Sequence, residues 1–220
     1  MPSLAVLKRR IEACDACPRL VAWREQVARE RRAAYADEDY WGRPVAGFGD
    51  PEARVFVLGL APAAHGANRT GRVFTGDRSG EWLYRAMWRA GLANQAESTA
   101  RDDGLELSGA WVSVAVRCAP PANKPLPAER DECAPWLAAE LAALRRVDTI
   151  VALGAFAWEA ACRVGGAARP WPKFAHGAEA VVGKYRLLGS YHVSQQNTFT
   201  GRLTEPMLDA IFTRARHHAE

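Results

Sequence analysis

The pattern of apolar and polar positions divides the chain into short apolar runs and longer segments of helical periodicity. The run RVFVLGL at 54–60 is rich in β-branched and apolar residues and has the length of a buried strand. The segment at 79–90 instead places Trp82, Leu83 and Met87 at helical spacing, and Gly91 ends it. By the same criteria we predict strands at 54–60, 111–116, 149–154 and 185–191, and helices at 3–13, 19–32, 79–90, 129–144, 155–163 and 205–217.

Strands and helices alternate along most of the chain. Such alternation favours a mostly parallel sheet that is covered by helices on both faces, with right-handed crossovers between strands. Pro135 lies inside the apolar pattern at 129–144, so we expect a kink or a late helix start there. Because 220 residues suffice for one good hydrophobic core, we predict a single domain over residues 1–220.

Composition narrows the class of protein only slightly. The net charge of +4 and the pI near 8.9 fit a polyanionic partner, but many proteins without such a partner are equally basic. No stretch approaches the roughly 20 apolar residues of a membrane span, and the N-terminus lacks the apolar centre of a secretory signal. We therefore expect a cytoplasmic protein with no membrane partner. Its five cysteines, an odd number, indicate metal ligation or buried thiols rather than disulfides.

Four of the cysteines have a spacing that suits a metal centre. Cys14 and Cys17 form a C-x2-C pair, and Cys118 and Cys133 follow much later in the chain. Four thiolates from two distant segments can close a tetrahedral zinc site or bind an iron-sulfur cluster. Spacing alone puts zinc slightly ahead and leaves unrelated reduced thiols open. Cys162 lies in the apolar run AFAWEAAC and is predicted to be a buried, inert thiol.

The loop GLAPAAHGANRTGRVFTGDRSG at 59–80 follows the first predicted strand and is rich in glycine and small residues. A phosphate-binding P-loop is excluded, because Ala67 and Asn68 stand where a lysine and a hydroxyl residue should follow Gly66. A dinucleotide-binding fingerprint fails as well, since the loop is too long before its helix begins. Ligands of open α/β sheets bind at the carboxyl ends of the strands, so we expect a different kind of site here.

The segment SYHVSQQNTFTGRLT at 190–204 follows the last predicted strand and should lie at the same edge of the sheet. A lone histidine such as His192 is more often structural than catalytic in this setting. Its pairing with Asp77 of the first loop favours a site. Asp77 also suits a role as a helix cap, because GDRSG directly precedes a predicted helix.

Three segments, GLAPAAHGANRTGRVFTGDRSG, VRCAPPANKP and HVSQQNTFTGRLT, together with the four cysteines, resemble the uracil-DNA glycosylase superfamily, and most of all its family 5, the B-type glycosylases. The resemblance implies a three-layer α/β/α fold around a four-stranded, mostly parallel sheet. It implies a [4Fe-4S] cluster on the four cysteines, which reverses the preference for zinc, and we expect this cluster to be structural and to staple the N-terminal helices within 1–35. It also implies a DNA repair enzyme that hydrolyses the N-glycosidic bond of uracil and related deaminated bases in DNA and leaves an abasic site.

The resemblance further implies roles for residues of the three motifs. His192 would donate a hydrogen bond to a base carbonyl oxygen, as neutral imidazole or imidazolium, and Asp77 would orient water and offset positive charge on the sugar. Phe74 matches a stacking phenylalanine, although by itself it would more often be a core residue. Asn123 can read a pyrimidine edge, although an asparagine between prolines is also a common loop residue.

Small residues of the first motif bear on the substrate range. Gly59 and Ala61 leave room for a flipped base and its sugar, but Leu60 and Ala61 cannot activate water where sister families carry an acidic residue or asparagine. Val114 stands where family 4 has an asparagine that reads uracil. Fewer polar contacts predict a range broader than uracil alone, including hypoxanthine and modified uracils.

The expected DNA contacts lie in the first and last loops. Gln195, Gln196 and Asn197 are predicted to fill the gap that a flipped base leaves, although the segment could be an ordinary polar turn. Arg202 can meet phosphate, and Arg69 is a further candidate.

A different class of function remains open. A metal-stapled module that binds nucleic acid without catalysis would also account for the basic balance and the missing early acidic residue. It would account equally for four arginines near the predicted edge, Arg69, Arg72, Arg78 and Arg202. By analogy with the family, we expect the protein to act as a monomer.

Overall fold

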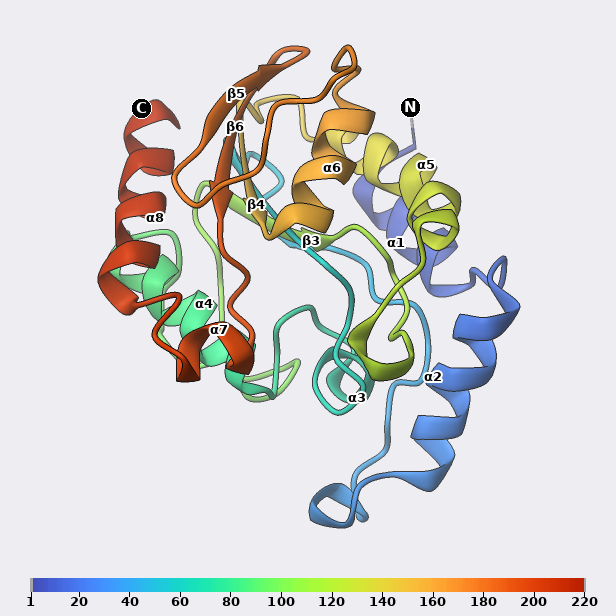
Figure 1. Cartoon of the computed structure of the whole chain (residues 1–220). Coiled ribbons are helices and arrows are strands. Elements are labelled where there is room, and N and C mark those ends of the chain that lie inside the picture. The colour runs from blue at the N-terminus through green and yellow to red at the C-terminus, as the bar shows by residue number, and fades with distance from the viewer. Residues whose placement is uncertain (1, 220) are drawn as a thin grey trace.

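The computed structural model describes residues 2–219 and contains one sheet between two layers of helices (Figure 1). The strands are β1 (Phe48–Gly49), β2 (Val55–Gly59), β3 (Ala110–Val114), β4 (Thr149–Leu153), β5 (Glu179–Val182) and β6 (Tyr185–Ser190). Their order in the sheet is β1-β3-β2-β4-β6-β5. The four central strands are parallel, and the two edge strands, β1 and β5, pair antiparallel to their neighbours.

The expectation of a four-stranded sheet is therefore wrong in number, because it omits the two edge strands. The four predicted strands form the parallel centre. β1 has two residues, too few to show any alternation of apolar and polar positions. β5 lies at an edge with three of its four residues at least partly exposed, and Val181 is largely exposed. Edge strands lack the continuous apolar run that marks a buried parallel strand.

Alternate residues of the central strands point to opposite faces of the sheet and enter two separate cores. In β2, Val55 and Val57 pack in one core, whereas Phe56 and Leu58 pack in the other. β4 repeats this division. All four of these β2 side chains are fully buried, and each contributes roughly 1.5–3 kcal/mol relative to an exposed position.

Helices cover both faces, as the alternation predicted. α4 and α8 contribute to the core that contains Val57, and α5 and α6 contribute to the core that contains Phe56, with α1 packed on α5. α5 begins before Pro135, so a late helix start is ruled out. The helices are α1 (Leu4–Glu12), α2 (Pro18–Glu30), α3 (Ala67–Thr70), α4 (Arg78–Arg89), α5 (Pro127–Ala143), α6 (Ala155–Val164), α7 (Gln195–Phe199) and α8 (Glu205–Ala219), with 3-10 turns η1 (Ala33–Tyr35) and η2 (Pro121–Asn123).

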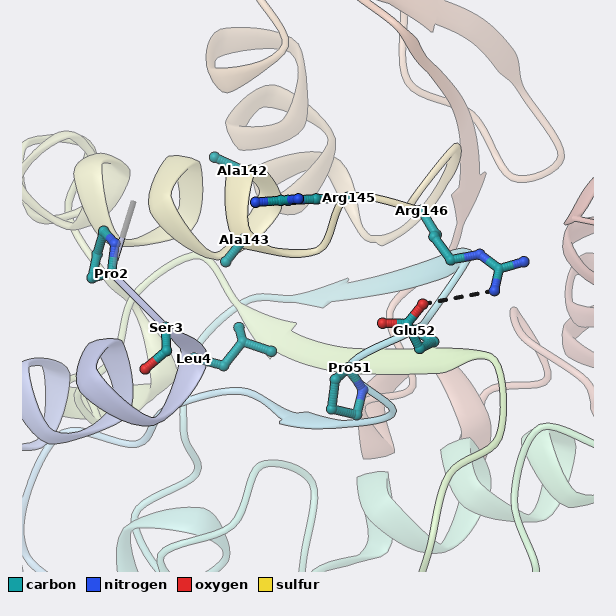
Figure 2. Close-up of a pocket in the computed structure, with 9 residues that line it drawn as sticks. All are labelled: Pro2, Ser3, Leu4, Pro51, Glu52, Ala142, Ala143, Arg145 and Arg146. Carbon is teal, nitrogen blue, oxygen red and sulfur yellow. Dashed lines mark ion pairs between the residues drawn. The ribbon is translucent and has the colours of Figure 1, made fainter.

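The carboxyl and amino ends of the parallel strands form two different edges of the sheet. The carboxyl ends of β2, β3 and β6 lead into the three motif-bearing loops. At the opposite edge, a cavity of about 630 Å³ is lined by Leu4, Glu52, Arg145 and Arg146 among others (Figure 2). None of the predicted site residues lines this cavity; the loops that carry them lie at the carboxyl ends of the strands. Within residues 2–219, no helix combines the length and apolar character needed to cross a lipid bilayer.

Candidate active site and metal centre

The loops after β2 and β6 bring Phe74 and His192 together at the carboxyl edge of the sheet. Their ring centroids lie 6.4 Å apart, and the rings are tilted by 39°. The ring of Phe74 packs on Gly59, the last residue of β2, where a Cβ would come within 2.5 Å of Phe74 Cζ. Glycine at position 59 is thus required for the observed position of the aromatic ring.

The backbone of Phe74 has a positive φ of 53°, in the left-handed region that L-residues rarely adopt. Its side chain is buried. For a bulky residue this conformation is strained by about 1–3 kcal/mol and needs support from the surrounding structure. Phe74 also packs in the core that contains Val57, and such strain is common at ligand-binding sites.

His192 follows β6 and is half-buried. Burial lowers its pKa from 6.5 to about 4, so the imidazole is neutral at neutral pH. The side-chain amide of Asn197 donates a hydrogen bond of 2.8 Å to the main-chain oxygen of His192. Asn197 therefore holds the histidine loop in place, a role that the sequence alone did not indicate.

Asp77 is the N-cap of α4, as one of its two expected roles requires. Its Oδ1 accepts a hydrogen bond of 3.0 Å from the backbone N–H of Gly80. Its Oδ2 lies against Gly66, where any Cβ would clash with the carboxylate. Burial raises the pKa of Asp77, although hydrogen bonds from the helix N-terminus oppose that rise. The capping bond from Gly80 uses Oδ1, and Oδ2 faces Gly66.

Asn123 and Ala61 come from the loops after β3 and β2, respectively. Asn123 is exposed in η2, and both it and Ala122 have positive φ angles, of 54° and 52°. Ala61 packs on the cluster that contains Cys118 and Cys133. Ala61 thus links the end of β2 to the cysteines.

The predicted DNA contacts divide into buried and exposed groups. Arg69 is 8% exposed; it pairs with Glu38 and donates to the main-chain oxygens of His65 and Gly76. This differs from the expectation of a phosphate contact. Of the other predicted contacts, Gln195, Gln196 and Arg202 are exposed, and Arg202 stacks on Tyr191.

Sequence reasoning missed Phe199, the last residue of α7. It is 64% exposed, and the guanidinium of Arg78, at the start of α4, lies 4.5 Å from its ring centroid. The sequence signal for this residue was a phenylalanine within a run of amide and hydroxyl side chains. Phe199 gives the edge that carries His192 an exposed apolar side chain.

The four cysteines surround one cavity. Cys14 and Cys17 precede α2, Cys118 follows β3, and Cys133 lies within α5. Burial is the main cause that raises the pKa values of Cys17, Cys118 and Cys133 to about 11, and the neighbouring thiols add to it. Among residues 2–219, no three histidine, cysteine or acidic side chains converge closely enough to hold a single metal ion.

Two buried arginines line the same cavity. Arg24 Nη1 donates hydrogen bonds to Cys118 Sγ at 3.0 Å and to the main-chain oxygen of Cys14 at 3.1 Å. Arg117 is held by Ser113 and Glu140. The Nε atoms of both arginines are buried and have no hydrogen-bond acceptor within the described residues. Unpaired guanidinium donors beside four thiols suit an anionic group with sulfur ligands.

Comparison with known proteins identifies the family of the chain. The family model of the uracil-DNA glycosylase superfamily matches residues 46–216. Type-5 uracil-DNA glycosylases that resemble the chain include those of Mycobacterium tuberculosis, at 55% identity over 97% of this chain and 81% of the relative, and Thermus thermophilus, at 51% over 95% of each. The enzyme of Pyrobaculum aerophilum is 46% identical over 94% of this chain and 89% of the relative.

The matches cover nearly the whole chain, including the N-terminal cysteines that lie outside the superfamily model. The chain belongs to the uracil-DNA glycosylase superfamily and, within it, to the type-5 uracil-DNA glycosylases.

Proposed function

We propose that this protein hydrolyses the N-glycosidic bond of uracil and of related deaminated bases in DNA, as a base-excision repair glycosylase. One observation carries the proposal: in a chain of this family, the ring centroids of Phe74 and His192 lie 6.4 Å apart at the carboxyl edge of the sheet. In the reaction the C1′–N bond breaks and the base leaves with the bonding electrons; water then supplies a hydroxyl group to C1′ and a proton to the base. A single copy of the chain supplies both loops, so the proposal needs no second subunit.

His192 acts as a neutral hydrogen-bond donor. With a pKa of about 4 it carries no charge at neutral pH, yet one ring nitrogen still has a proton to donate. A donor aimed at the carbonyl oxygen of the departing base stabilises negative charge as that charge develops. The hydrogen bond from Asn197 fixes the main chain from which the imidazole projects.

Asp77 acts at the sugar. Its Oδ2, on the side away from the Gly80 hydrogen bond, orients a water molecule and stabilises positive charge that develops near C1′. Asp77 must be ionised for this purpose, and the backbone N–H groups of α4 favour the ionised form against the effect of burial.

Phe74 and Phe199 serve the flipped nucleotide and the duplex, respectively. Phe74 offers its buried ring as the stacking surface for the base in the pocket. Phe199 is exposed on the same edge, and apolar side chains of this kind enter base steps and hold the helix open. Gln195 and Gln196 lie four and three residues before it and can contact the partner strand.

Four cysteines, Cys14, Cys17, Cys118 and Cys133, hold a [4Fe-4S] cluster in this proposal. The four thiols line one cavity, and such a cluster would take one thiolate ligand from each of them. The cluster supplies structural cross-linking and no step of the hydrolysis. Visible absorption of anaerobically purified protein distinguishes it from zinc, which is colourless.

The substrate range extends beyond uracil. Leu60, Ala61 and Val114 bring no polar side-chain group to the first and second motifs, and Asn123 is exposed on its loop. Fewer polar contacts to the base mean weaker discrimination. Excision of hypoxanthine opposite the same partner base tests this, and strict uracil specificity would contradict it.

Abasic-site formation tests the activity. Wild-type protein, His192→Ala and the control His217→Ala, on α8, are incubated with a uracil-containing oligonucleotide, and alkali then cleaves any abasic sites. We expect cleavage with wild type and with the control, and a large loss with His192→Ala. DNA binding without strand cleavage by the wild type would favour the non-catalytic module instead.

A further inference from the structure

A network of polar side chains surrounds the backbone of the strained residue Phe74. The peptide groups on both sides of Phe74 take part in it. The main-chain oxygen of Val73 accepts hydrogen bonds from Tyr84 Oη at 2.8 Å and from Thr75 Oγ1 at 3.2 Å. The main-chain oxygen of Thr75 accepts one from Thr70 Oγ1 at 3.3 Å. The network therefore fixes the backbone immediately before and after the aromatic residue.

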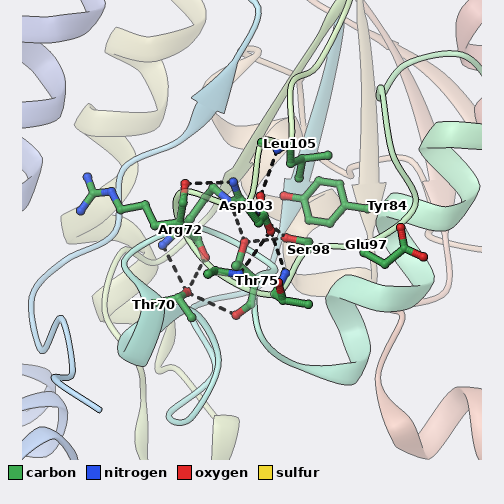
Figure 3. Close-up of polar contacts among 12 residues, drawn as sticks. Thr70, Arg72, Thr75, Tyr84, Glu97, Ser98, Asp103 and Leu105 are labelled. Carbon is green, nitrogen blue, oxygen red and sulfur yellow. Dashed lines mark hydrogen bonds and ion pairs between the residues drawn. The ribbon is translucent and has the colours of Figure 1, made fainter.

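Arg72 lies at the centre of this network (Figure 3). Its Nε donates to Thr75 Oγ1 at 2.9 Å, and its Nη2 donates to Ser98 Oγ at 3.0 Å. The same nitrogen reaches both carboxylate oxygens of Asp103, at 2.8 and 2.7 Å. Arg72 is 6% exposed, so it cannot serve as the DNA contact that its charge suggested.

Asp103 holds the opposite side of the network. Besides Arg72, its carboxylate accepts hydrogen bonds from the backbone N–H groups of Thr99, Ala100 and Leu105. Burial alone would raise its pKa, but these hydrogen bonds outweigh burial and lower it. The sequence alone assigned no role to the polar segment before β3. This segment folds around the carboxylate of Asp103, which faces Arg72.

We infer that Arg72 and Asp103 are a positioning pair, which fixes the backbone around Phe74 so that its ring forms the stacking surface of the base pocket. The inference rests on the proposed function for the role of Phe74 and goes beyond it by assigning what holds Phe74. The ion pair is buried on both sides, at 7% and 10% side-chain exposure, and hydrogen bonds through Thr75 and Ser98 link it to the backbone beside Phe74. It touches neither His192 nor Asp77 directly within the described contacts.

The same network explains why Phe74 does not relax. The main-chain oxygen of Phe74 lies against Gly80 of α4, where there is no space for a side chain. The N–H of Gly76 donates to the main-chain oxygen of Ser98 at 2.8 Å. Loss of the Arg72–Asp103 contact would leave the segment from Val73 to Gly76 free to adopt an unstrained conformation, and the ring would then leave Gly59.

A double-mutant cycle tests the inference on the full-length protein loaded with its metal centre. Asp103→Asn preserves the size of the side chain and removes its charge, and Phe74→Ala removes the ring. We measure the single-turnover rate of uracil excision in wild type, both single variants and the double variant. Asp148→Asn, at the Arg54–Asp148 pair beside the amino end of β4, is the matched control.

We expect Asp103→Asn to lower the rate about tenfold alone and less than about twofold in the Phe74→Ala background, because interacting residues are not additive. Asp148→Asn should leave the rate unchanged. Additive effects, or a normal rate for Asp103→Asn, would overturn the inference. If Asp103→Asn fails to fold, Ser98→Ala, which removes one hydrogen bond from Arg72, replaces it in the same cycle.

A crystal structure of the Asp103→Asn or Ser98→Ala variant separates this inference from the proposed activity. We expect Phe74 to have lost its positive φ and its contact with Gly59. If Phe74 keeps both, the inference fails even if the protein is an active glycosylase. If the wild type excises no uracil, the proposed function fails, while the structure of the variant still decides whether the pair holds Phe74.

Discussion

The ring of Phe74 lies so close to Gly59 that a Cβ on residue 59 would stand 2.5 Å from Phe74 Cζ and 2.7 Å from Cε2. Gly59→Ala therefore has to displace the ring, because the backbone of Phe74 is held on both sides. We expect uracil excision to slow about 10- to 100-fold, since a displacement of about 1 Å in an active site has effects of this size. Single-turnover rates measure the change.

Gly109→Ala is the control for this substitution. Gly109 has a positive φ of 67°, but nothing lies within 4 Å of a Cβ built there. We expect it to lose about 1–2 kcal/mol of folding free energy through backbone strain and to keep a normal excision rate. An unchanged rate for Gly59→Ala would show that the position of Phe74 does not matter.

Asp77 can be tested for its two roles separately. Asparagine is as good an N-cap as aspartate, whereas alanine loses about 1 kcal/mol of cap stability. Because burial raises the pKa of Asp77, its ionised form is disfavoured in the folded state, so stability decreases as pH rises through that pKa. We expect Asp77→Asn to keep or raise the melting temperature at neutral pH and to lower excision at least about 100-fold.

Asp77→Ala should lose both stability and activity. Calorimetry and single-turnover rates on the three proteins separate the effects. Near-normal excision by Asp77→Asn would show that Asp77 acts only as the N-cap of α4.

The pH dependence reports on His192. Its folded-state pKa, about 4, lies below the 6.5 of an ordinary histidine. The excision rate should therefore have no inflection near pH 6.5, and the imidazole should stay neutral from about pH 5 upward. Since the unfolded chain binds this proton more readily, the stability that the neutral form contributes is lost as pH falls from 6.5 towards 4. NMR titration of His192 measures its pKa directly, and a value near 6.5 contradicts this prediction.

Patterns along the chain determine the centre of the fold better than its edges. Phe56 and Val57 of β2 point to opposite faces of the sheet. Both are apolar because both faces of a central parallel strand are buried. β5 could not be predicted in this way, because Val181 and its neighbours are partly solvated and pair along one side only. An edge strand is stabilised mainly by its partner, which lies elsewhere in the sequence.

Arginines show the same limit at the site. Arg69 and Arg72 have the charge that suits a phosphate contact, but Glu38 and Asp103 bury them as ion pairs. Nothing local to residues 69–72 indicates these partners. The burial of Arg24 could have been predicted from the sequence, because Arg24 lies at helical spacing between Leu20 and Val27 on one face of α2.

Arg24 offers a test of the metal centre. Its guanidinium is 6% exposed and donates to Cys118 Sγ. Arg24→Gln removes the charge beside the thiols, and changes to such supporting residues typically weaken metal binding about 10- to 100-fold. We expect faster loss of visible absorption and of iron under a chelator. Arg29→Gln, an exposed position on the same helix, should behave as wild type. Equal loss rates in the two variants would remove Arg24 from the support of the centre.

Phe199 tests how the duplex is opened. The side chain is 64% exposed, so Phe199→Ala should leave folding stability nearly unchanged. Extruding a base from a duplex costs a few kcal/mol, and that cost falls for a base that is already unpaired. We therefore expect about a tenfold slower excision of uracil from a duplex and little change on single-stranded DNA. Trp88→Ala, which truncates another exposed aromatic residue at the far end of α4, should affect neither substrate. Equal losses on both substrates would assign Phe199 to general DNA binding, because a wedge acts only where bases are stacked.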